Sequence, residues 1–328
     1  MLVLTSDKLG GPEAYTLQRQ PIPEPAENEV RLRVEATALG YVDALIAAGH
    51  YQHKPLPPYV PGAEIVGIVD RLGPRVEGVS IGDRVASWQL LAGGGVAEFA
   101  IARRDALVRV PDRLDAMAAA SLLLDHLTAW HALFDRGHLK AGETVLVLGA
   151  AGGIGTAAVQ IAAGAGARVI AAASSPEKRA RAMAMGAVAA VDYLAPDWRG
   201  ALRQLIPGGV DVVVDPVGGA TFEPAFRSLA KGGRHLILGF VGGDVPRLPA
   251  NLPLLKNGAL IGVDTCYLFE SDLARALEIW DTLFARAAAG LLKSRDSDIR
   301  GLDVAEAAFA SLARREKLRK IVIAPQHS

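Results

Sequence analysis

The chain has 328 residues, of which 51% are hydrophobic and 21% charged, a composition typical of a folded globular protein long enough for two domains. Lys plus Arg and Asp plus Glu balance at 35 each, so no net charge is expected to attract nucleic acid or an anionic membrane. The single cysteine, Cys266, excludes an internal disulfide and any zinc site built from several cysteines, and it fits a reducing compartment, with the cytosol as the default.

Short β-type runs separated by Gly and Pro dominate the chain up to about residue 120. The N-terminal residues 1–11 are typical of a short strand and turn and carry no export signal. The strands predicted after them are Glu29–Ala36, Ile65–Leu72, Arg84–Trp88, Val96–Ala102 and Ala106–Val110. This spacing predicts a mostly-β domain.

From about residue 122 the pattern changes to apolar strands that alternate with helical segments such as Pro176–Met185 and Thr221–Leu229. The predicted strands are Thr144–Leu148, Arg168–Ala173, Ala187–Val191, Val210–Val214, Gly233–Leu238 and Leu260–Val263. Strands in this alternation predict an α/β fold with a doubly wound parallel sheet. The uncharged run of residues 144–167 approaches the length of a membrane span, but its glycines favour a buried strand, turn and helix.

The last part of the chain, from Ser271 to Pro325, contains amphipathic helices and ends in a predicted strand, Lys320–Ala324. Because this part follows the completed sheet, we expect it to return to the first domain. The predicted organisation is therefore a discontinuous domain of residues 1–121 and 259–328, interrupted by a second domain of residues 122–258.

A glycine-rich turn, residues 149–155 (Gly-Ala-Ala-Gly-Gly-Ile-Gly), joins the predicted strand Thr144–Leu148 to a helical run that begins at Thr156. Glycines allow a tight turn and let a pyrophosphate approach the backbone N–H groups, while the helix dipole favours its negative charge. The strand before the turn and the helix after it supply the context that a bare glycine motif lacks. We therefore expect a dinucleotide to bind here, in preference to a purely structural turn.

The end of the next strand distinguishes NADPH from NADH. An acidic residue about 20 positions beyond the glycines would bind the ribose 2′-hydroxyl of NAD, and the strand ends without one. It continues instead as Ala-Ser-Ser-Pro-Glu-Lys-Arg (residues 173–179), which offers hydroxyls and cations to a 2′-phosphate. Ser175 and Pro176 also fit the start of a helix, and the two roles are compatible. The sequence favours NADPH.

Further motifs follow one another in a fixed order along the chain. They are Pro61-Gly62-Ala63-Glu64 followed by Gly67, Gly82-Asp83-Arg84-Val85, Ala97-Glu98-Phe99, Leu127-Thr128-Ala129-Trp130, the turn at 149–155, and Asp215-Pro216-Val217-Gly218-Gly219. Over nearly its whole length the chain thereby resembles the zinc-free quinone oxidoreductase branch of the medium-chain dehydrogenase/reductase superfamily, which includes zeta-crystallin. The resemblance implies a GroES-like catalytic domain (1–121 and 259–328), a Rossmann dinucleotide-binding domain (122–258), a cleft between them for nicotinamide and substrate, and a homodimer through the edge strand near Leu260–Val263.

The resemblance also implies roles for individual residues. The pyrophosphate would lie at Gly152, Gly153 and Ile154, the 2′-phosphate at Ser175 and Lys178 with the hydroxyl of Ser174 beside them, and the adenosine at Tyr193. The nicotinamide and its ribose would be flanked by Thr128, Val217, Phe240 and Val241. A role in packing is the alternative for each of these residues.

Zinc-dependent relatives carry Cys or His ligands at positions where this chain has Gly40 and Ala63. A catalytic zinc needs about three protein ligands and a structural zinc four, so we expect no metal site. His126 is left as a lone metal-type residue, which is more often a buried or hydrogen-bonded histidine. Gly40 also departs from the Asn that many quinone reductases have there, which leaves the usual quinone specificity open.

Without a metal, hydrogen-bond donors are expected to stabilise charge on the acceptor oxygen when hydride arrives. Tyr51 matches a tyrosine that related enoyl thioester reductases use beside the substrate, and its phenol can donate a proton, although it would equally cover an apolar wall. Tyr41 and Asp43 are weaker candidates for the substrate cleft, and Asp43 fits a helix cap better. The loop that contains Gly94 would either admit a flat substrate or act as a flexible turn.

These patterns favour an NADPH-dependent reductase of small-molecule quinones or α,β-unsaturated carbonyl compounds. The alternative is an NADPH-dependent enoyl thioester (enoyl-CoA) reductase, which predicts a basic groove that residues 314–320 would supply, although a solvated helix end is the commoner meaning of such a run. Zeta-crystallin has lens-structural and RNA-binding roles, but the balanced charge and the cofactor turn disfavour a non-enzymatic role here.

Overall fold

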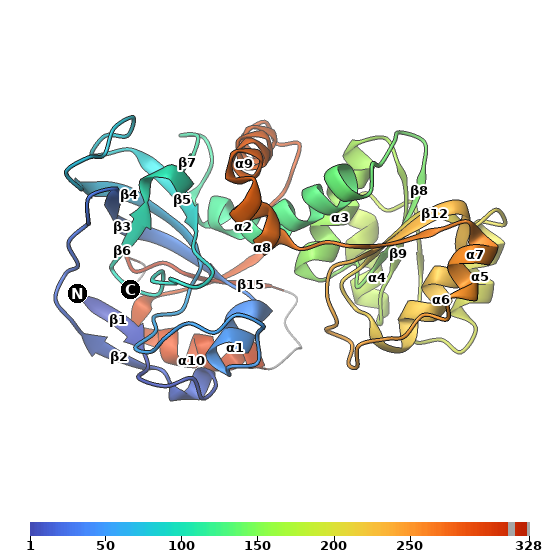
Figure 1. Ribbon diagram of the computed structural model, residues 1–328, viewed down its shortest axis with the longest axis horizontal. Helices are drawn as coiled ribbons and strands as arrows, with labels where there is room; N and C mark the ends of the chain where they lie inside the picture. Colours follow the sequence, from blue (N-terminus) through green and yellow to red (C-terminus); the bar gives the residue numbers. More distant parts are fainter. Residues whose placement is uncertain (314–318, 327–328) are drawn as a thin grey trace. The chain divides into compact units, whose positions relative to one another are not determined.

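The computed structural model describes residues 1–313 and 319–326. The chain forms two compact units, one of residues 125–272 and one that combines residues 1–124 with 273–328 (Figure 1). The sequence predicts domain boundaries at 121/122 and 258/259, whereas the two units divide at 124/125 and 272/273. The second observed boundary lies after strand β13 (Ala259–Gly262). This strand pairs in parallel with β12 (Leu229–Ile237) and therefore belongs to the second unit.

A seven-stranded sheet forms the centre of the first unit. Its order is β14 (Ser297–Arg300), β15 (Lys320–Ile323), β3 (Glu29–Leu39), β4 (Glu64–Leu72), β5 (Arg84–Trp88) and β7 (Val108–Arg109), and β6 (Phe99–Arg103) also pairs with β3. A separate antiparallel pair consists of β1 (Leu2–Thr5) and β2 (Thr16–Arg19). Since β15 pairs antiparallel with β3, the C-terminal strand completes a sheet that the N-terminal segment begins.

Helices of the first unit bury an aromatic cluster against this sheet. The short helices α1 (Tyr41–Ala47) and α10 (Ala305–Ala310) contribute to it, and the ring of Tyr15 lies edge-on to Tyr59 and to Phe309. The amphipathic α9 (Leu273–Ala288) buries Trp280, whose indole N–H donates to a carbonyl of α2 (Ala116–Trp130) over 2.9 Å. These contacts anchor the C-terminal helices to the N-terminal segment.

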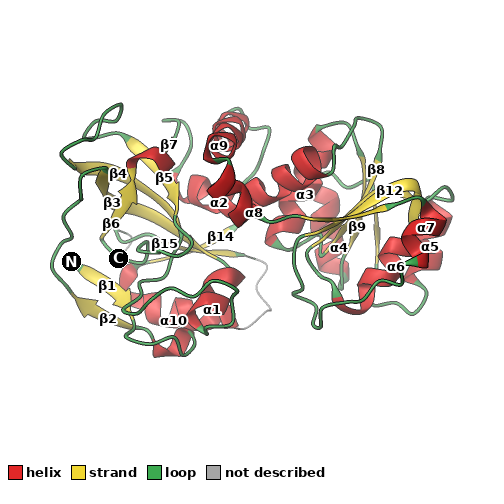
Figure 2. Ribbon diagram, viewed as in Figure 1, coloured by secondary structure: helices red, strands yellow, loops and turns green. Residues whose placement is uncertain are grey.

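The six-stranded sheet of the second unit is parallel throughout. Its order is β10 (Ala189–Val191), β9 (Arg168–Ala172), β8 (Thr144–Leu148), β11 (Val210–Asp215), β12 and β13. One face is covered by α3 (Gly153–Gly164) and α4 (Pro176–Ala184), and the other by α5 (Trp198–Leu205), α6 (Phe222–Arg227) and α7 (Asn251–Lys256) (Figures 1 and 2). The direction of strand addition reverses at β8, the position at which doubly wound sheets bind ligands. The predicted fold class is confirmed.

Some element bounds differ from the predicted ones because partners elsewhere in the chain decide them. β6 begins at Phe99 and not at Val96, since the N–H of Val96 donates to Pro61 O and that of Glu98 to Leu2 O. The last predicted strand before residue 111 shortens to β7, because a 3-10 turn precedes it. β2, β14 and α2 have no counterpart among the predicted elements.

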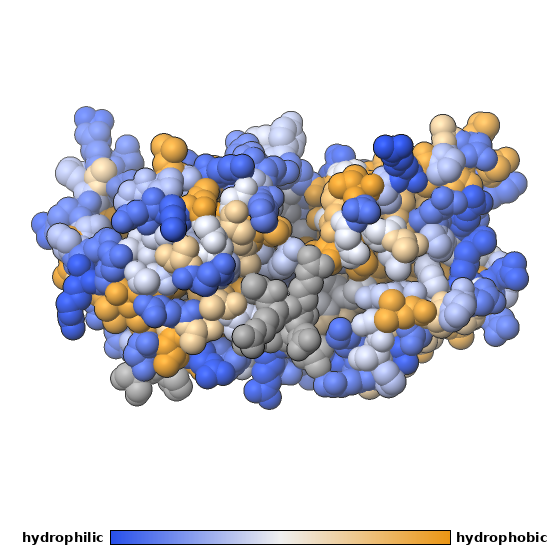
Figure 3. Space-filling model, turned by 90° about the horizontal axis from the view of Figure 1, so that it is seen from below, coloured by the Kyte–Doolittle hydropathy of each residue, from blue (hydrophilic) through white to orange (hydrophobic). Residues whose placement is uncertain are grey.

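The uncharged run of residues 144–167 divides into β8, the glycine turn and α3, whose apolar side chains lie inside the second unit. Within the described residues, no helix is long and apolar enough to cross a membrane. On the face of the molecule in Figure 3, hydrophobic and hydrophilic residues are interspersed.

Candidate functional site

The glycine turn after β8 is shaped by close backbone contacts. Gly149 has a φ of 59°, and a Cβ added at Gly155 would lie 2.1 Å from the carbonyl oxygen of Gly149. The first helical position of α3 is preceded by Gly152, which has no side chain to cover the amide groups of the first turn. Because the first N–H groups of a helix lack intrahelical acceptors, this turn fits a pyrophosphate.

Gly153 begins α3 directly under a carboxylate. A Cβ at this position would lie 2.2 Å from Oδ2 of Asp125, so a larger residue would displace the Asp125 side chain. No sequence motif indicates this contact, because Asp125 belongs to none. Ile154, the next predicted phosphate-binding residue, follows in the same helical turn.

The tip of β9 brings the predicted 2′-phosphate residues together. Ser175 caps α4 by accepting the N–H of Lys178 over 3.2 Å, and Lys178 Nζ lies 3.3 Å from the hydroxyl oxygen of Ser174. Arg179 has other partners. Its guanidinium donates to the carbonyl of Ala173 and lies 2.9 Å from a carboxylate oxygen of Asp192. Lys178 therefore contacts both hydroxyls, Ser174 through its ammonium and Ser175 through its backbone N–H.

Residues after β11 and β12 converge beside the glycine turn. Val217 is buried, and a Cβ at Gly149 would lie 3.0 Å from its Cγ2. The carbonyl oxygens of Pro216 and Val217 accept the N–H groups of Val241 and Gly242 over 3.3 and 2.7 Å. Phe240 and Val241 remain 40% and 42% exposed, so the segment after β12 presents apolar side chains that could contact a flat ring.

The remaining predicted cofactor residues lie at two positions in the second unit. Thr128 is buried in α2, and its hydroxyl lies 3.0 Å from that of Thr265, the first residue of α8 (Thr265–Ser271). Tyr193 follows β10 and is partly buried against the apolar cluster of the sheet. Tyr193 could therefore form the wall of an adenosine site and also contribute to packing.

Asp43 acts as a helix cap in the first unit. The N–H of Gly40 donates to its Oδ2 over 2.7 Å at the start of α1. Burial raises the pKa of Asp43, and the hydrogen bond from Gly40 and the ammonium of Lys320 oppose that shift. Tyr41 is the first residue of α1 and is partly buried.

A buried ion pair lies beside the two positions at which zinc-dependent relatives have ligands. Lys320 Nζ lies 2.7 Å from Oε1 of Glu64, and their side chains are 4% and 1% exposed. A Cβ at Gly40 would lie 3.6 Å from this ammonium. Gly40 and Ala63 offer no ligand atom, and no cluster of three or more His, Cys, Asp or Glu able to hold a metal occurs in residues 1–313 and 319–326. The residues present do not fit a catalytic zinc.

Tyr51 lies in the loop after α1. Its ring is partly buried against the hydrophobic cluster of the first unit, which includes Tyr15, Tyr59 and Phe309, and its centroid lies 6.2 Å from that of the His53 ring. The structure thus assigns Tyr51 a packing contact. His126, the lone metal-type residue, is buried in α2 at 2% exposure.

The glycine loop that contains Gly94 is fixed by its own backbone. The N–H groups of Gly93, Gly94 and Gly95 donate to three carbonyls of the chain over 2.7, 2.9 and 2.9 Å. A Cβ at Gly93 would meet the ring of Tyr59 at 2.9 Å, whereas the space beside Gly94 is open apart from Ala100. A substrate at Gly94 would therefore meet bare backbone, but the loop amides already have acceptors.

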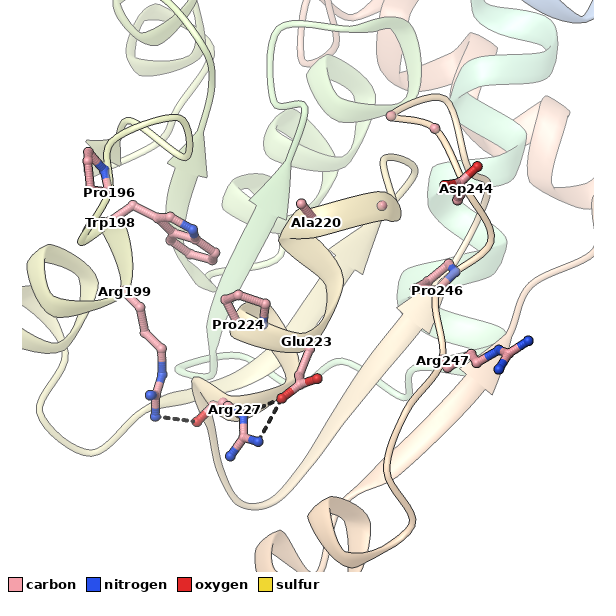
Figure 4. Close-up of a pocket in the computed structure, with 13 residues that line it drawn as sticks. Pro196, Trp198, Arg199, Ala220, Glu223, Pro224, Arg227, Asp244, Pro246 and Arg247 are labelled. Atoms are coloured by element: carbon pink, nitrogen blue, oxygen red, sulfur yellow. Dashed lines mark hydrogen bonds and ion pairs between the residues drawn. The ribbon is translucent and has the colours of Figure 1, made fainter.

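A hollow of about 880 Å³ lies in the second unit beside the segments that follow β11 and β12. Figure 4 shows Glu223 and Arg227 pointing toward each other, with Arg199 donating to the carbonyl of Arg227. The lining also includes Asp244 and Arg247, so its charges are mixed. Of the predicted basic run, residues 314–318 lie outside the described residues, Arg319 is exposed, and Lys320 is buried in the ion pair.

Comparison with known proteins gives consistent matches in both halves of the chain. Residues 26–112 match the family model described as alcohol dehydrogenase GroES-like domain, and residues 153–281 match the one described as zinc-binding dehydrogenase. A quinone oxidoreductase-like protein 2 homolog of Nematostella vectensis is 35% identical over 299 residues, which cover 90% of this chain and 81% of that protein.

Solved structures match over the full length. A mycobacterial quinone oxidoreductase is 31% identical with a TM-score of 0.86, covering 99% of this chain and 100% of the other. A mycobacterial protein solved in complex with NADPH is 30% identical with a TM-score of 0.88, again covering 99% and 100%.

Proposed function

The chain belongs to the quinone oxidoreductase group of the medium-chain dehydrogenase/reductase superfamily, and we propose that it is an NADPH-dependent reductase of quinones or α,β-unsaturated carbonyl compounds that acts without zinc. Oxidoreductase activity with a nicotinamide cofactor follows from the family and the fold. The observation that carries the finer proposal is the tip of β9, where Lys178 and Ser174 meet.

The preference for NADPH rests on charge at this tip. Lys178 and two serine hydroxyls would surround a 2′-phosphate, and charge-assisted bonds of this kind are stronger than neutral ones. β9 ends at Ala172, and neither this residue nor the following Ala173 offers a carboxylate to bind a ribose 2′-hydroxyl. The carboxylate of Asp192, which follows the neighbouring strand β10, pairs with Arg179.

A zinc-independent reaction requires polar groups of the chain to stabilise the product. When bound, reduced nicotinamide supplies the hydride, and reduction of the acceptor then needs one proton for each hydride. The phenol of Tyr51 is our candidate for donating a hydrogen bond or that proton to the acceptor, because a phenol can do either. The amides of the glycine loop are not candidates, since each already donates to a carbonyl.

A homodimer through β13 is part of the proposal. β13 forms the edge of its sheet, and an edge strand with exposed backbone groups can pair with a second chain. Leu260 in this strand is 39% exposed, and Leu254 and Leu255 in the preceding helix are 79% and 68% exposed. Light scattering on the purified protein would measure the mass, and a monomer at micromolar concentration would argue against this interface.

The function is tested by oxidation of NADPH and of NADH with a small panel: a benzoquinone, a naphthoquinone, an alkenal, a cyclic enone and an enoyl-CoA. We expect turnover with NADPH and with quinones or enones, and weaker turnover with NADH. Turnover confined to enoyl-CoA would support an enoyl thioester reductase instead. Binding of neither nucleotide, measured by calorimetry without substrate, would contradict the cofactor site itself.

A further inference from the structure

Two buried polar side chains meet between β11 and β12. Nε2 of His235 lies 2.9 Å from Oδ2 of Asp215, and their side chains are 0% and 1% exposed. Asp215 is the last residue of β11, and His235 lies on the neighbouring parallel strand. Neither residue belongs to the proposed phosphate or nicotinamide contacts. Their role is therefore to be sought in the parts of the chain to which they are hydrogen-bonded.

The other oxygen of Asp215 fixes the turn that follows β11. Its Oδ1 accepts the backbone N–H groups of Val217 and Gly218, both over 2.8 Å. Gly218 has a φ of 65° and a ψ of −141°, a backbone conformation that residues with a side chain rarely adopt. The carboxylate thus holds this unusual turn from inside the protein.

The turn after β11 also holds the segment after β12. The carbonyls of Pro216 and Val217 accept the N–H groups of Val241 and Gly242. The ring of Phe240 packs against Gly218, where an added Cβ would lie 2.8 Å from its Cδ1. One buried carboxylate therefore organises Val217, Phe240 and Val241, the apolar residues of the proposed nicotinamide site.

His235 orients this carboxylate within an apolar cage. Its ring lies 4.6 Å from the ring of Phe222 and 6.0 Å from that of Phe226, measured between centroids. Two amide donors on Oδ1 are the partners that an ionised carboxylate prefers, so we assign the proton between the pair to His235 Nε2. Among the described residues, the second ring nitrogen has no hydrogen-bond partner. Burying a polar ring here is costly, and a role limited to packing would not require it.

We propose that Asp215 and His235 are positioning residues for the nicotinamide half of the cofactor. They hold the walls of that half without touching it, whereas the 2′-phosphate corner at β9 does not depend on them. This inference rests on the proposed cofactor site. It separates the two ends of the dinucleotide and can therefore be tested with a fragment that occupies one end only.

The experiment compares binding of NADPH and of 2′,5′-ADP, a fragment without nicotinamide, by calorimetry. His235→Phe keeps a ring between Phe222 and Phe226 but removes the donor. We expect the Kd of NADPH to rise about tenfold, the size of effect that loss of one hydrogen bond to a charged group produces. The Kd of 2′,5′-ADP should stay within about twofold. His235→Gln, which keeps an N–H donor, should restore most of the affinity for NADPH.

Leu236→Ala is the matched control, because Leu236 is fully buried next to His235 in the same strand, lies near Gly137 and has no polar side-chain group. Equal weakening of both ligands by His235→Phe, unchanged binding of NADPH, or the same selective loss in Leu236→Ala would overturn the proposal. Should His235→Phe not fold, Asp215→Asn is measured in its place, with the same selective loss expected. Wild-type protein that binds 2′,5′-ADP and NADPH equally well would overturn this inference alone, whereas wild-type protein that binds neither would overturn the proposed cofactor site as well.

Discussion

The ammonium of Lys320 lies 2.7 Å from the carboxylate of Glu64, and both side chains are almost completely buried. The second oxygen of Glu64 accepts the N–H of Leu124 over 2.9 Å. The carboxylate of Glu64, at the start of β4, therefore connects this strand to β15 and to α2. In sequence the two charged residues are 256 positions apart.

Removing one member of this pair should destabilise the protein strongly. Glu64→Gln would leave the Lys320 ammonium buried without its carboxylate, a change that costs about 3–5 kcal/mol in the free energy of unfolding. Glu35→Gln is the matched control, because Glu35 pairs with Arg84 over 2.7 Å but both side chains are partly exposed. It should cost about 1 kcal/mol or less. Urea unfolding at neutral pH measures both, and equal losses would refute the distinction.

Lys178 should determine the choice between the two nucleotides. Lys178→Ala removes the cation beside Ser174 and should raise the KM for NADPH about tenfold or more, with little change for NADH. Lys231→Ala, at an exposed position of β12, is the control and should alter neither KM. A parallel loss for both nucleotides would place Lys178 outside the 2′-phosphate site.

Gly155 should not tolerate even one additional carbon atom. In Gly155→Ala the new methyl group would lie 2.1 Å from the carbonyl oxygen of Gly149, so α3 would have to shift away from the turn. We expect a loss of about 1–3 kcal/mol in stability and weaker binding of both nucleotides. Gly208→Ala adds the same group where no atom lies within 4 Å and should be neutral. Normal nucleotide affinity in Gly155→Ala would contradict a pyrophosphate at this turn.

Replacing Tyr51 distinguishes chemistry from packing. Tyr51→Phe keeps the ring against the hydrophobic cluster of the first unit and removes only the phenol oxygen. If this phenol supplies the proton to an enone, kcat should fall about 100-fold while the Kd of NADPH stays the same. Tyr267→Phe, at a site 68% exposed, serves as the control. An unchanged kcat would leave Tyr51 with a packing role alone.

Stability in acid should depend on Glu143. The guanidinium of Arg234 bonds both oxygens of Glu143 over 2.6 and 2.7 Å, and it lowers the pKa of this carboxyl below the ordinary value of 4.5. A lowered folded-state pKa adds stability that is complete above the unfolded pKa and disappears as the pH falls through the folded pKa. Unfolding free energies measured between about pH 7 and about pH 3 should therefore decline less steeply in Glu143→Gln. Identical slopes would show that another group controls the acid limit.

Local patterns along the chain predicted most of the architecture. The glycine turn could be placed because its strand, its glycines and its helix are adjacent in sequence. The cap at Ser175 could be predicted for the same reason, since capping depends on residues within one helical turn. β2 and β14 were missed because short, polar edge segments carry little hydrophobic alternation.

Buried polar pairs between distant segments could not be predicted. Asp215 lies within a recognised motif, but nothing in the sequence connects it to His235, because their contact depends on the register of β11 and β12. Asp125 lies over Gly153 only because α2 passes the start of α3. The one available signal for such a pair is a carboxylate in a hydrophobic strand, as at Glu64. It predicts that the carboxylate has a polar partner, but it does not identify that partner.

The discontinuity of the first unit has a consequence for how the protein is made. β3 emerges early from the ribosome, but its partner β15 is synthesised only after the whole of the second unit. The second unit is contiguous, so all six of its strands are available before β15 is made. Because domains generally fold as units during synthesis, we expect the nucleotide-binding unit to fold while residues Thr37–Leu39 of β3 are still unpaired, until β15 has been synthesised.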